Sequence, residues 1–188
     1  MAVAKKYAGI GASLVAHIKN TRTPFSIDFG VGDVIVPKQE KRKIPTQLDD
    51  FISPTVNTYS LETTIAEKLD AILDLMEFSS RMKDYYDIYY LANKFDFDGK
   101  VLTEALKKTF ENRGHSFTVE QFEQVMSFAD DSAMQKKWKA FCRKIDTKTD
   151  DFNTVLKIIE AFLTKPLTVA VECKEFTEKW SAADGEWM

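Results

Sequence analysis

Residues 60–78 read SLETTIAEKLDAILDLMEF, and this stretch decides what kind of fold the chain can adopt. Ser60 is a favourable residue to cap a helix, and apolar residues then recur every three or four positions as far as Phe78. This spacing places the apolar side chains on one face of a helix. Before Ser60 the pattern differs, because apolar residues alternate with small or polar ones as they do in strands. We therefore expect strands before residue 60 and helices after it.

The strand-like part contains two alternating segments. Residues 10–18 and 25–29 both alternate with a period of two. Residues 21–24, TRTP, are expected to interrupt the chain between them, and Gly30 and Gly32 indicate a turn or bulge just beyond the second segment. These segments predict a small sheet.

The residues after 78 predict further helices and an irregular tail. A second helix is expected over residues 81–94. Later helices are expected near residues 100–112, 118–128, 131–145 and 150–164, with a strand at Leu167–Val171. The predicted fold class is α+β, with a small mixed or antiparallel sheet followed by an α-helical bundle. We expect three parts: a strand-rich part at residues 1–60, a helical domain at 61–166 and a C-terminal tail at 167–188.

The composition excludes several classes of protein. Of the 188 residues 44% are hydrophobic and 29% are charged, which is ordinary for a globular domain and too apolar for a disordered chain. The formal net charge of −3 gives no general attraction to nucleic acid or to an anionic membrane. No uninterrupted apolar run is long enough for a membrane span, and no signal-peptide pattern opens the sequence. Cys142 and Cys173 are far apart and match no metal or redox spacing, which fits reduced cysteines, so we expect a cytoplasmic protein. His17 and His115 stand alone in the sequence and suggest no set of metal ligands.

Asp28 is the first candidate for chemistry. It lies between Ile27 and Phe29 in the second strand-like segment, so its carboxylate should face away from both apolar side chains. If that face lines a cleft, the carboxylate can bind a divalent cation or act as a base. The alternative is an ordinary solvated aspartate on a half-exposed strand.

Lys68 is the second candidate. It lies beside the apolar stripe of its helix rather than opposite it, so its ammonium group can remain near other elements of the fold. A lysine in such a place can contact phosphate oxygens as a compact charge. The alternative is a surface lysine whose aliphatic stem covers apolar surface.

The third candidate is residues 81–90, RMKDYYDIYY. Asp84 and Asp87 are three residues apart and therefore project from nearly the same helix face, while Arg81 and Lys83 precede them at ion-pair spacing. Such pairs stabilise a helix by only about 0.2–0.5 kcal/mol each, which hardly explains so dense a cluster. Both a functional and a structural role remain open for this run.

Three segments together resemble one known family. They are residues 24–37, PFSIDFGVGDVIVP, residues 59–71, YSLETTIAEKLDA, and residues 81–89, RMKDYYDIY. Their order and spacing resemble those of the AbiEii-like nucleotidyltransferases, the toxin component of type IV toxin–antitoxin and abortive-infection systems in phage defence.

The resemblance implies an activity and assigns roles to residues. Nucleotidyltransferases of this kind hold a nucleoside triphosphate with Mg²⁺ and transfer a nucleotide to an acceptor, for which the resemblance suggests a tRNA 3′ end. Asp28 would support the metal or activate the acceptor. The catalytic residues would be Asp28, Lys68 and Asp84, and the nucleotide-binding residues would be Lys68, Arg81, Lys83 and Asp87.

The sequence departs from the family at one point. The superfamily uses a Gly-Ser turn followed by an Asp-x-Asp strand, and no Asp-x-Asp precedes Asp28. If residues 11–14 were that turn and Asp28 the first carboxylate, the second would fall on Gly30. We therefore expect an incomplete nucleotidyltransferase fold that lacks the catalytic carboxylate pair and is inactive alone.

Three functional interpretations remain open. The first is the C-terminal part of a nucleotide-transferring toxin that joins a separately encoded front half. The second is a non-catalytic module that binds a nucleotide, RNA or a protein partner, and the third is a helical scaffold whose polar cluster is structural. A toxin implies a cognate antitoxin, and an open sheet edge invites self-association into a homo-oligomer.

Overall fold

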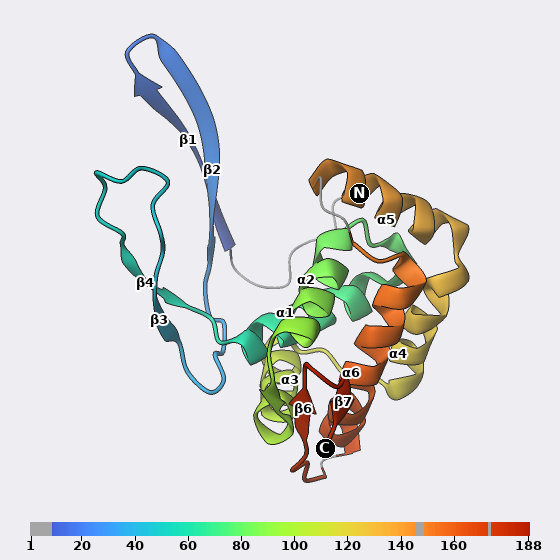
Figure 1. Cartoon of the computed structure of the whole chain (residues 1–188). Helices are drawn as coiled ribbons and strands as arrows, with labels where there is room; N and C mark the ends of the chain where they lie inside the picture. The colour runs from blue at the N-terminus through green and yellow to red at the C-terminus, as the bar shows by residue number, and fades with distance from the viewer. Residues whose placement is uncertain (1–8, 146–148, 173) are drawn as a thin grey trace. The chain divides into compact units, whose positions relative to one another are not determined.

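A two-stranded antiparallel hairpin begins the described part of the chain (Figure 1). The computed structural model describes residues 9–145, 149–172 and 174–188. In the hairpin, β1 (Gly9–Ile18) pairs along its whole length with β2 (Thr21–Gly30). Both strands predicted from the alternating pattern are therefore confirmed.

The position of the break between these strands was predicted wrongly. The chain reverses at Lys19 and Asn20, where Lys19 has a positive φ of 52°. Pro24 does not interrupt the sheet, because it lies inside β2 opposite Val15. A proline is tolerated there since each strand of a two-stranded sheet has an edge on which no backbone N–H is needed.

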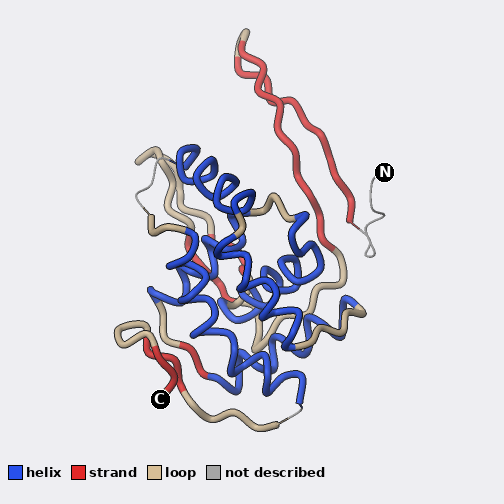
Figure 2. The backbone as a smooth tube through the Cα atoms, turned by 90° about the vertical axis from the view of Figure 1, so that its right-hand side faces the viewer, coloured by secondary structure: helices blue, strands red, loops and turns tan. Residues whose placement is uncertain are grey.

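The chain divides into two compact units, Met1–Val34 and Ile35–Met188, which are described separately. The second unit contains every α-helix of the described residues, and Figure 2 shows these helices in blue. They are α1 (Leu61–Leu75), α2 (Met82–Lys94), α3 (Gly99–Arg113), α4 (Val119–Met126), α5 (Ser132–Ile145) and α6 (Phe152–Glu172). Short 3-10 turns follow α1 at Met76–Phe78 and α4 at Ser127–Asp130. No helix within the described ranges combines the length and apolarity needed to cross a bilayer.

Two small antiparallel sheets accompany the helices. One pairs β3 (Glu40–Lys43) with β4 (Thr55–Thr58), and the other has the order β5 (Phe97–Asp98), β6 (Lys179–Ser181), β7 (Glu186–Trp187). The predicted α+β class, a small antiparallel sheet followed by a helical bundle, is thus confirmed.

The core of the second unit forms where α6 packs against α2, α3 and α4, and where α1 packs against α3. The central part of the apolar stripe predicted for the first helix, Ile65 to Ile72, is buried there, as are the inward faces of α2, α3 and α6. Fully buried members of this core are Ile65, Leu69, Ile72, Tyr85, Ile88, Leu102, Leu106 and Phe162. Burial of these large side chains supplies the main driving force for folding.

Helix α6 continues eight residues beyond its predicted end, so the strand predicted at Leu167–Val171 is wrong. A proline inside a helix removes one N–H donor, and the carbonyl four residues earlier loses its partner. For Pro166 that carbonyl belongs to Phe162, and the indole N–H of Trp187 donates to it at 2.9 Å. The C-terminal hairpin thus satisfies the group that the proline leaves unpaired.

The end of the chain is part of the core rather than a loose tail. Trp187 stacks on Phe162 with ring centroids 5.8 Å apart and an interplanar angle of 2°. Trp180 is buried and donates its indole N–H to the carbonyl of Ala92, at 2.7 Å. These two contacts join β6 and β7 to α6 and α2.

The substitution Trp187→Phe tests the role of the indole N–H. It keeps an aromatic ring but leaves the Phe162 carbonyl unpaired, so we expect a loss of about 1–3 kcal/mol in the free energy of unfolding. Trp187→Ala also removes the ring, and we expect it to cost about 3–5 kcal/mol. Urea unfolding followed by circular dichroism measures both.

The control for these two variants is Phe78→Ala, because Phe78 is 84% exposed. Its free energy of unfolding should change by no more than about 0.5 kcal/mol. Wild-type stability of Trp187→Phe would contradict the role given to Trp187 at Pro166.

Candidate functional site

Helices α1 and α2 bring the predicted lysine and the two predicted aspartates together. The Nζ atom of Lys68 lies 3.2 Å from Oδ1 of Asp84 and 2.6 Å from Oδ2 of Asp87. The lysine comes from the middle of α1, and the carboxylates come from the first two turns of α2. A lysine ammonium has three N–H donors, and these contacts use two of them.

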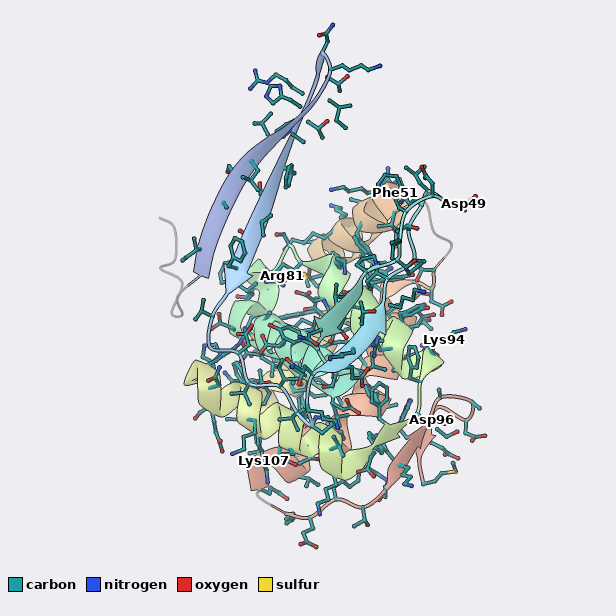
Figure 3. All side chains as sticks on the ribbon, turned by 90° about the vertical axis from the view of Figure 1, so that its left-hand side faces the viewer. Asp49, Phe51, Arg81, Lys94, Asp96 and Lys107 are labelled. Carbon is teal, nitrogen blue, oxygen red and sulfur yellow. The ribbon has the colours of Figure 1, made fainter. Side chains whose placement is uncertain are left out.

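Two more cations surround the same carboxylates from α2 itself. Nε of Arg81 lies 2.6 Å from Oδ2 of Asp84, and Nζ of Lys83 lies 2.5 Å from Oδ2 of Asp87. Oδ2 of Asp84 accepts no well-directed hydrogen bond among the described residues, so its contact with Arg81 is electrostatic. Figure 3 labels Arg81, which precedes the first turn of α2, and Lys94, which ends this helix.

The charged side chains of this cluster differ in their exposure to solvent. The side chain of Asp84 is 3% exposed and that of Lys68 is 18% exposed, whereas Arg81 and Lys83 are 57% and 71% exposed. Three cations face two carboxylates, so the cluster carries one net positive charge. Its inner ion pair is fixed between helices, and its outer cations are accessible to an anion.

The turn before α2 is held by α5. Nζ of Lys137 donates to the carbonyl oxygens of Glu77 and Ser79, at 3.0 Å and 2.9 Å. The hydroxyl of the buried Ser79 in turn accepts from the backbone N–H of Arg81 at 3.1 Å. These contacts fix where α2 begins and therefore where its carboxylates lie.

The start of α1 is tied to the chain segment before it. Ser60 caps the helix as predicted, since its hydroxyl accepts from the backbone N–H of Thr63 at 3.1 Å. Ser60 also donates to the carbonyl of Val36. The backbone N–H of Val36 donates to Thr63 Oγ1 at 2.8 Å. This link between two of the sequence segments quoted above was not predicted from the sequence.

Asp28 lies in β2 opposite Gly11, in the first unit. A side chain at position 11 would place its Cβ 3.3 Å from the Asp28 carboxylate, so glycine leaves room for that group. Lys68 and Asp84 belong to the second unit, so a joint role of the three residues remains a prediction.

The residues present do not complete a magnesium site. Among the residues that the structure describes, no group of three histidine, cysteine, aspartate or glutamate side chains is arranged to hold a metal ion. Mg²⁺ needs carboxylates and other oxygen ligands in near-octahedral geometry, and Asp28 alone supplies one carboxylate. Within the described ranges, protein side chains alone therefore do not surround this ion, and a bound triphosphate would supply oxygen ligands of its own.

The tyrosines of residues 81–90 are largely explained by packing. Tyr85 is fully buried and meets Phe152 edge to face, with centroids 5.4 Å apart. Tyr86 stacks on Tyr90 and also contacts Phe141 of α5. Tyr89 donates its hydroxyl to Asp150 at 2.6 Å, and burial together with this hydrogen bond raises the pKa of Tyr89 to about 12.

A second charged cluster, which joins α1 to the end of α3, was missed in the sequence. The carboxylate of Asp70 is buried and lies 2.8 Å from both Nη1 of Arg113 and Nδ1 of His115. Glu67 also pairs with Arg113. His115 is therefore not an isolated loop residue. The available signal was the spacing of Glu67, Asp70 and Asp74, which share one helix face.

A cleft of about 590 Å³ lies between α5 and the start of α6. It is lined by no residue of the Lys68 cluster, which comprises Lys68, Arg81, Lys83, Asp84 and Asp87. Its lining includes Trp138, Lys139, Arg143, Asp150 and Asn153. We place the candidate site at the Lys68 cluster rather than in this cleft. Charged groups from two helices meet at the Lys68 cluster, whereas those that line the cleft come from α5 and the loop before α6.

The comparisons with known proteins agree with the sequence motifs. The family model described as "Nucleotidyl transferase AbiEii toxin, Type IV TA system" matches residues 2–162, which include all three quoted segments. Neither a curated protein nor a solved structure matches the chain significantly.

A double-mutant cycle on Lys68→Met and Asp84→Asn tests how strongly the inner pair is coupled. Because these side chains are shielded from water, we expect a coupling of about 1.5–3 kcal/mol in the free energy of unfolding. The matched control is the exposed pair Lys165 and Glu178, which are 2.6 Å apart. Lys165→Met with Glu178→Gln should show only about 0.2–1 kcal/mol. Equal coupling energies in the two pairs would contradict the conclusion that the Lys68–Asp84 pair is shielded from water.

Proposed function

This chain belongs to the AbiEii family of nucleotidyl transferase toxins of type IV toxin–antitoxin systems, and we propose that its Lys68 cluster faces the nucleotide. The chain then acts as the C-terminal part of a nucleotide-transferring toxin. The observation that carries this proposal is the convergence of Lys68 from α1 on both Asp84 and Asp87 from α2.

The contacts support a division of labour within the cluster. Lys68 contacts the triphosphate, because its third N–H remains for an oxygen beyond the two carboxylates. The nearly buried Asp84 orients the lysine, and Asp87 assists from the next turn. Arg81 and Lys83 neutralise phosphate charge from the exposed side.

The transfer reaction needs more than this cluster. We assign Asp28 as the carboxylate of the first unit that supports the metal or activates the acceptor, with residues 1–60 as part of the nucleotidyltransferase core and 61–166 as the helical domain with the Lys and Asp motifs. The described residues offer no complete metal set. No Asp-x-Asp precedes Asp28. We assign the Gly-Ser turn and the two carboxylates to a separately encoded front half, without which the chain is inactive.

The proposed partners follow from the same role. A toxin of this family has a cognate antitoxin, and the acceptor of the nucleotide is a tRNA 3′ end in a cytoplasmic abortive-infection response. The two-stranded β1–β2 sheet leaves backbone groups of both strands unpaired, which supports strand addition by a front half or by a second copy of this chain.

A second candidate function is a non-catalytic module that binds a nucleotide, RNA or a protein partner. The sequence supports it in one respect, because no Asp-x-Asp strand precedes Asp28. It keeps the same positively charged cluster and differs only in the absence of turnover.

Calorimetric titration of the chain with ATP, CTP, GTP and UTP, with and without Mg²⁺, tests nucleotide binding. We expect at least one nucleotide to bind, and Lys68→Met to weaken its binding about tenfold or more, because the central phosphate contact is lost. The control Lys165→Met removes an exposed lysine outside the cluster and should bind as the wild type does. Absence of binding by the folded wild type with all four nucleotides would contradict the proposal.

Turnover separates the two candidate functions. A labelled-nucleotide transfer assay should show no product with the chain alone and Mg²⁺-dependent product when the front half is added. Nucleotide binding without product from a folded, reconstituted pair would instead support the non-catalytic module.

A further inference from the structure

The buried carboxylate of Asp70 lies at the centre of a second group of charges, which the proposed function does not use. Asp70 is on α1, but on a different face from Lys68. The two carboxylate oxygens of Asp70 contact different residues at the end of α3. Oδ2 contacts Arg113, and Oδ1 contacts His115. Burial raises the pKa of the Asp70 carboxyl, and the hydrogen bond with His115 opposes that rise. The charged form of this carboxylate therefore depends on its cationic neighbours.

The imidazole ring of His115 has a carboxylate near each of its nitrogen atoms. Nδ1 lies 2.8 Å from Oδ1 of Asp70, and Nε2 lies 3.7 Å from Oδ1 of Asp74. A neutral imidazole has one N–H, so it can donate to one carboxylate while its other nitrogen turns a lone pair toward the second. An imidazolium has two N–H groups and is attracted to both. The contact with Asp74 therefore distinguishes the two protonation states.

Acidic groups outnumber basic ones among the charged side chains near the ring. Helix α1 contributes Glu67, Asp70 and Asp74, while α3 contributes Arg113. Lys107 and Glu111 of α3 line the surface hollow beside the ring and offset each other, and α6 adds only Ala170 and Val171. Apart from His115 itself, the group therefore contains three carboxylates and one permanent cation, Arg113.

The backbone that carries His115 is a helix end of defined geometry. Gly114 ends α3 in the left-handed region, with φ of 66°, and its N–H donates to the carbonyl of Glu111. The N–H of His115 donates to the carbonyl of Phe110 at 3.0 Å. The ring of His115 also meets Phe117, with centroids 5.2 Å apart. The segment that follows α3 thus contacts α1 through the ring of His115 and contacts α3 through the N–H of His115 and the ring of Phe117.

We propose that Asp70, Asp74 and His115 form a proton-operated clamp, which holds residues 114–117 against α1 when the ring is protonated and loosens when the proton leaves. Histidine is the side chain that ordinarily changes charge between pH 5 and 8. The clamp is closed on the acidic side of this window and weakens as the pH rises through it. The clamp needs no bound nucleotide in order to operate.

Amide hydrogen exchange measured by NMR tests the clamp, because the N–H of His115 reports on the hydrogen bond to Phe110. We expect its protection factor, corrected for intrinsic exchange, to be about fivefold higher near pH 5.5 than near pH 8. Asp74→Asn should remove most of this difference, since Nε2 then faces no charge. Its side chain is 55% exposed, so the variant should fold.

Two further variants complete the test. His115→Gln should show low protection at both pH values, and Glu111→Gln should keep the wild-type response, because Glu111 pairs with Lys108 and not with the ring. Equal protection of the wild type at both pH values would overturn the clamp. An undiminished pH response in Asp74→Asn would overturn it as well.

Discussion

The ion pairs that Lys68 makes with Asp84 and Asp87 join helices α1 and α2 across their packed interface. An ion pair so largely withdrawn from water is tolerated only when its partners are held in good geometry. Both helices that carry these partners are anchored where they begin. Ser60 caps the start of α1, and Lys137 holds the turn before α2. The charged cluster is thus a consequence of how α1 and α2 start.

Helix α1 is the common element of the described contacts. Its first turn binds Val36, its middle sends Lys68 to α2, and its opposite side sends Glu67 and Asp70 to the end of α3. A change at one of these contacts should be felt at the others, since a helix rotates or shifts as a rigid rod. The proposed nucleotide site and the proposed proton clamp therefore share one helix while using different faces of it.

The sequence predicted most of the secondary structure because its apolar period is clear on both sides of Ser60. It also predicted that Lys68 and Asp84 belong together, although by resemblance rather than by spacing. It failed where the deciding partner is distant in the chain. The continuation of α6 through Pro166 depends on Trp187, and the role of His115 depends on Asp70, which is 45 residues away. No local pattern records such contacts. The role of Asp28 with Lys68 stays a prediction.

A chemical-shift map of the chain during titration with a nucleoside triphosphate tests the proposed nucleotide site most directly, because it locates the ligand rather than only detecting it. We predict that the largest shifts of backbone amides fall in α1 around Lys68 and in the first two turns of α2. Shifts confined to the cleft between α5 and α6, or no shifts with any nucleotide, would contradict this site.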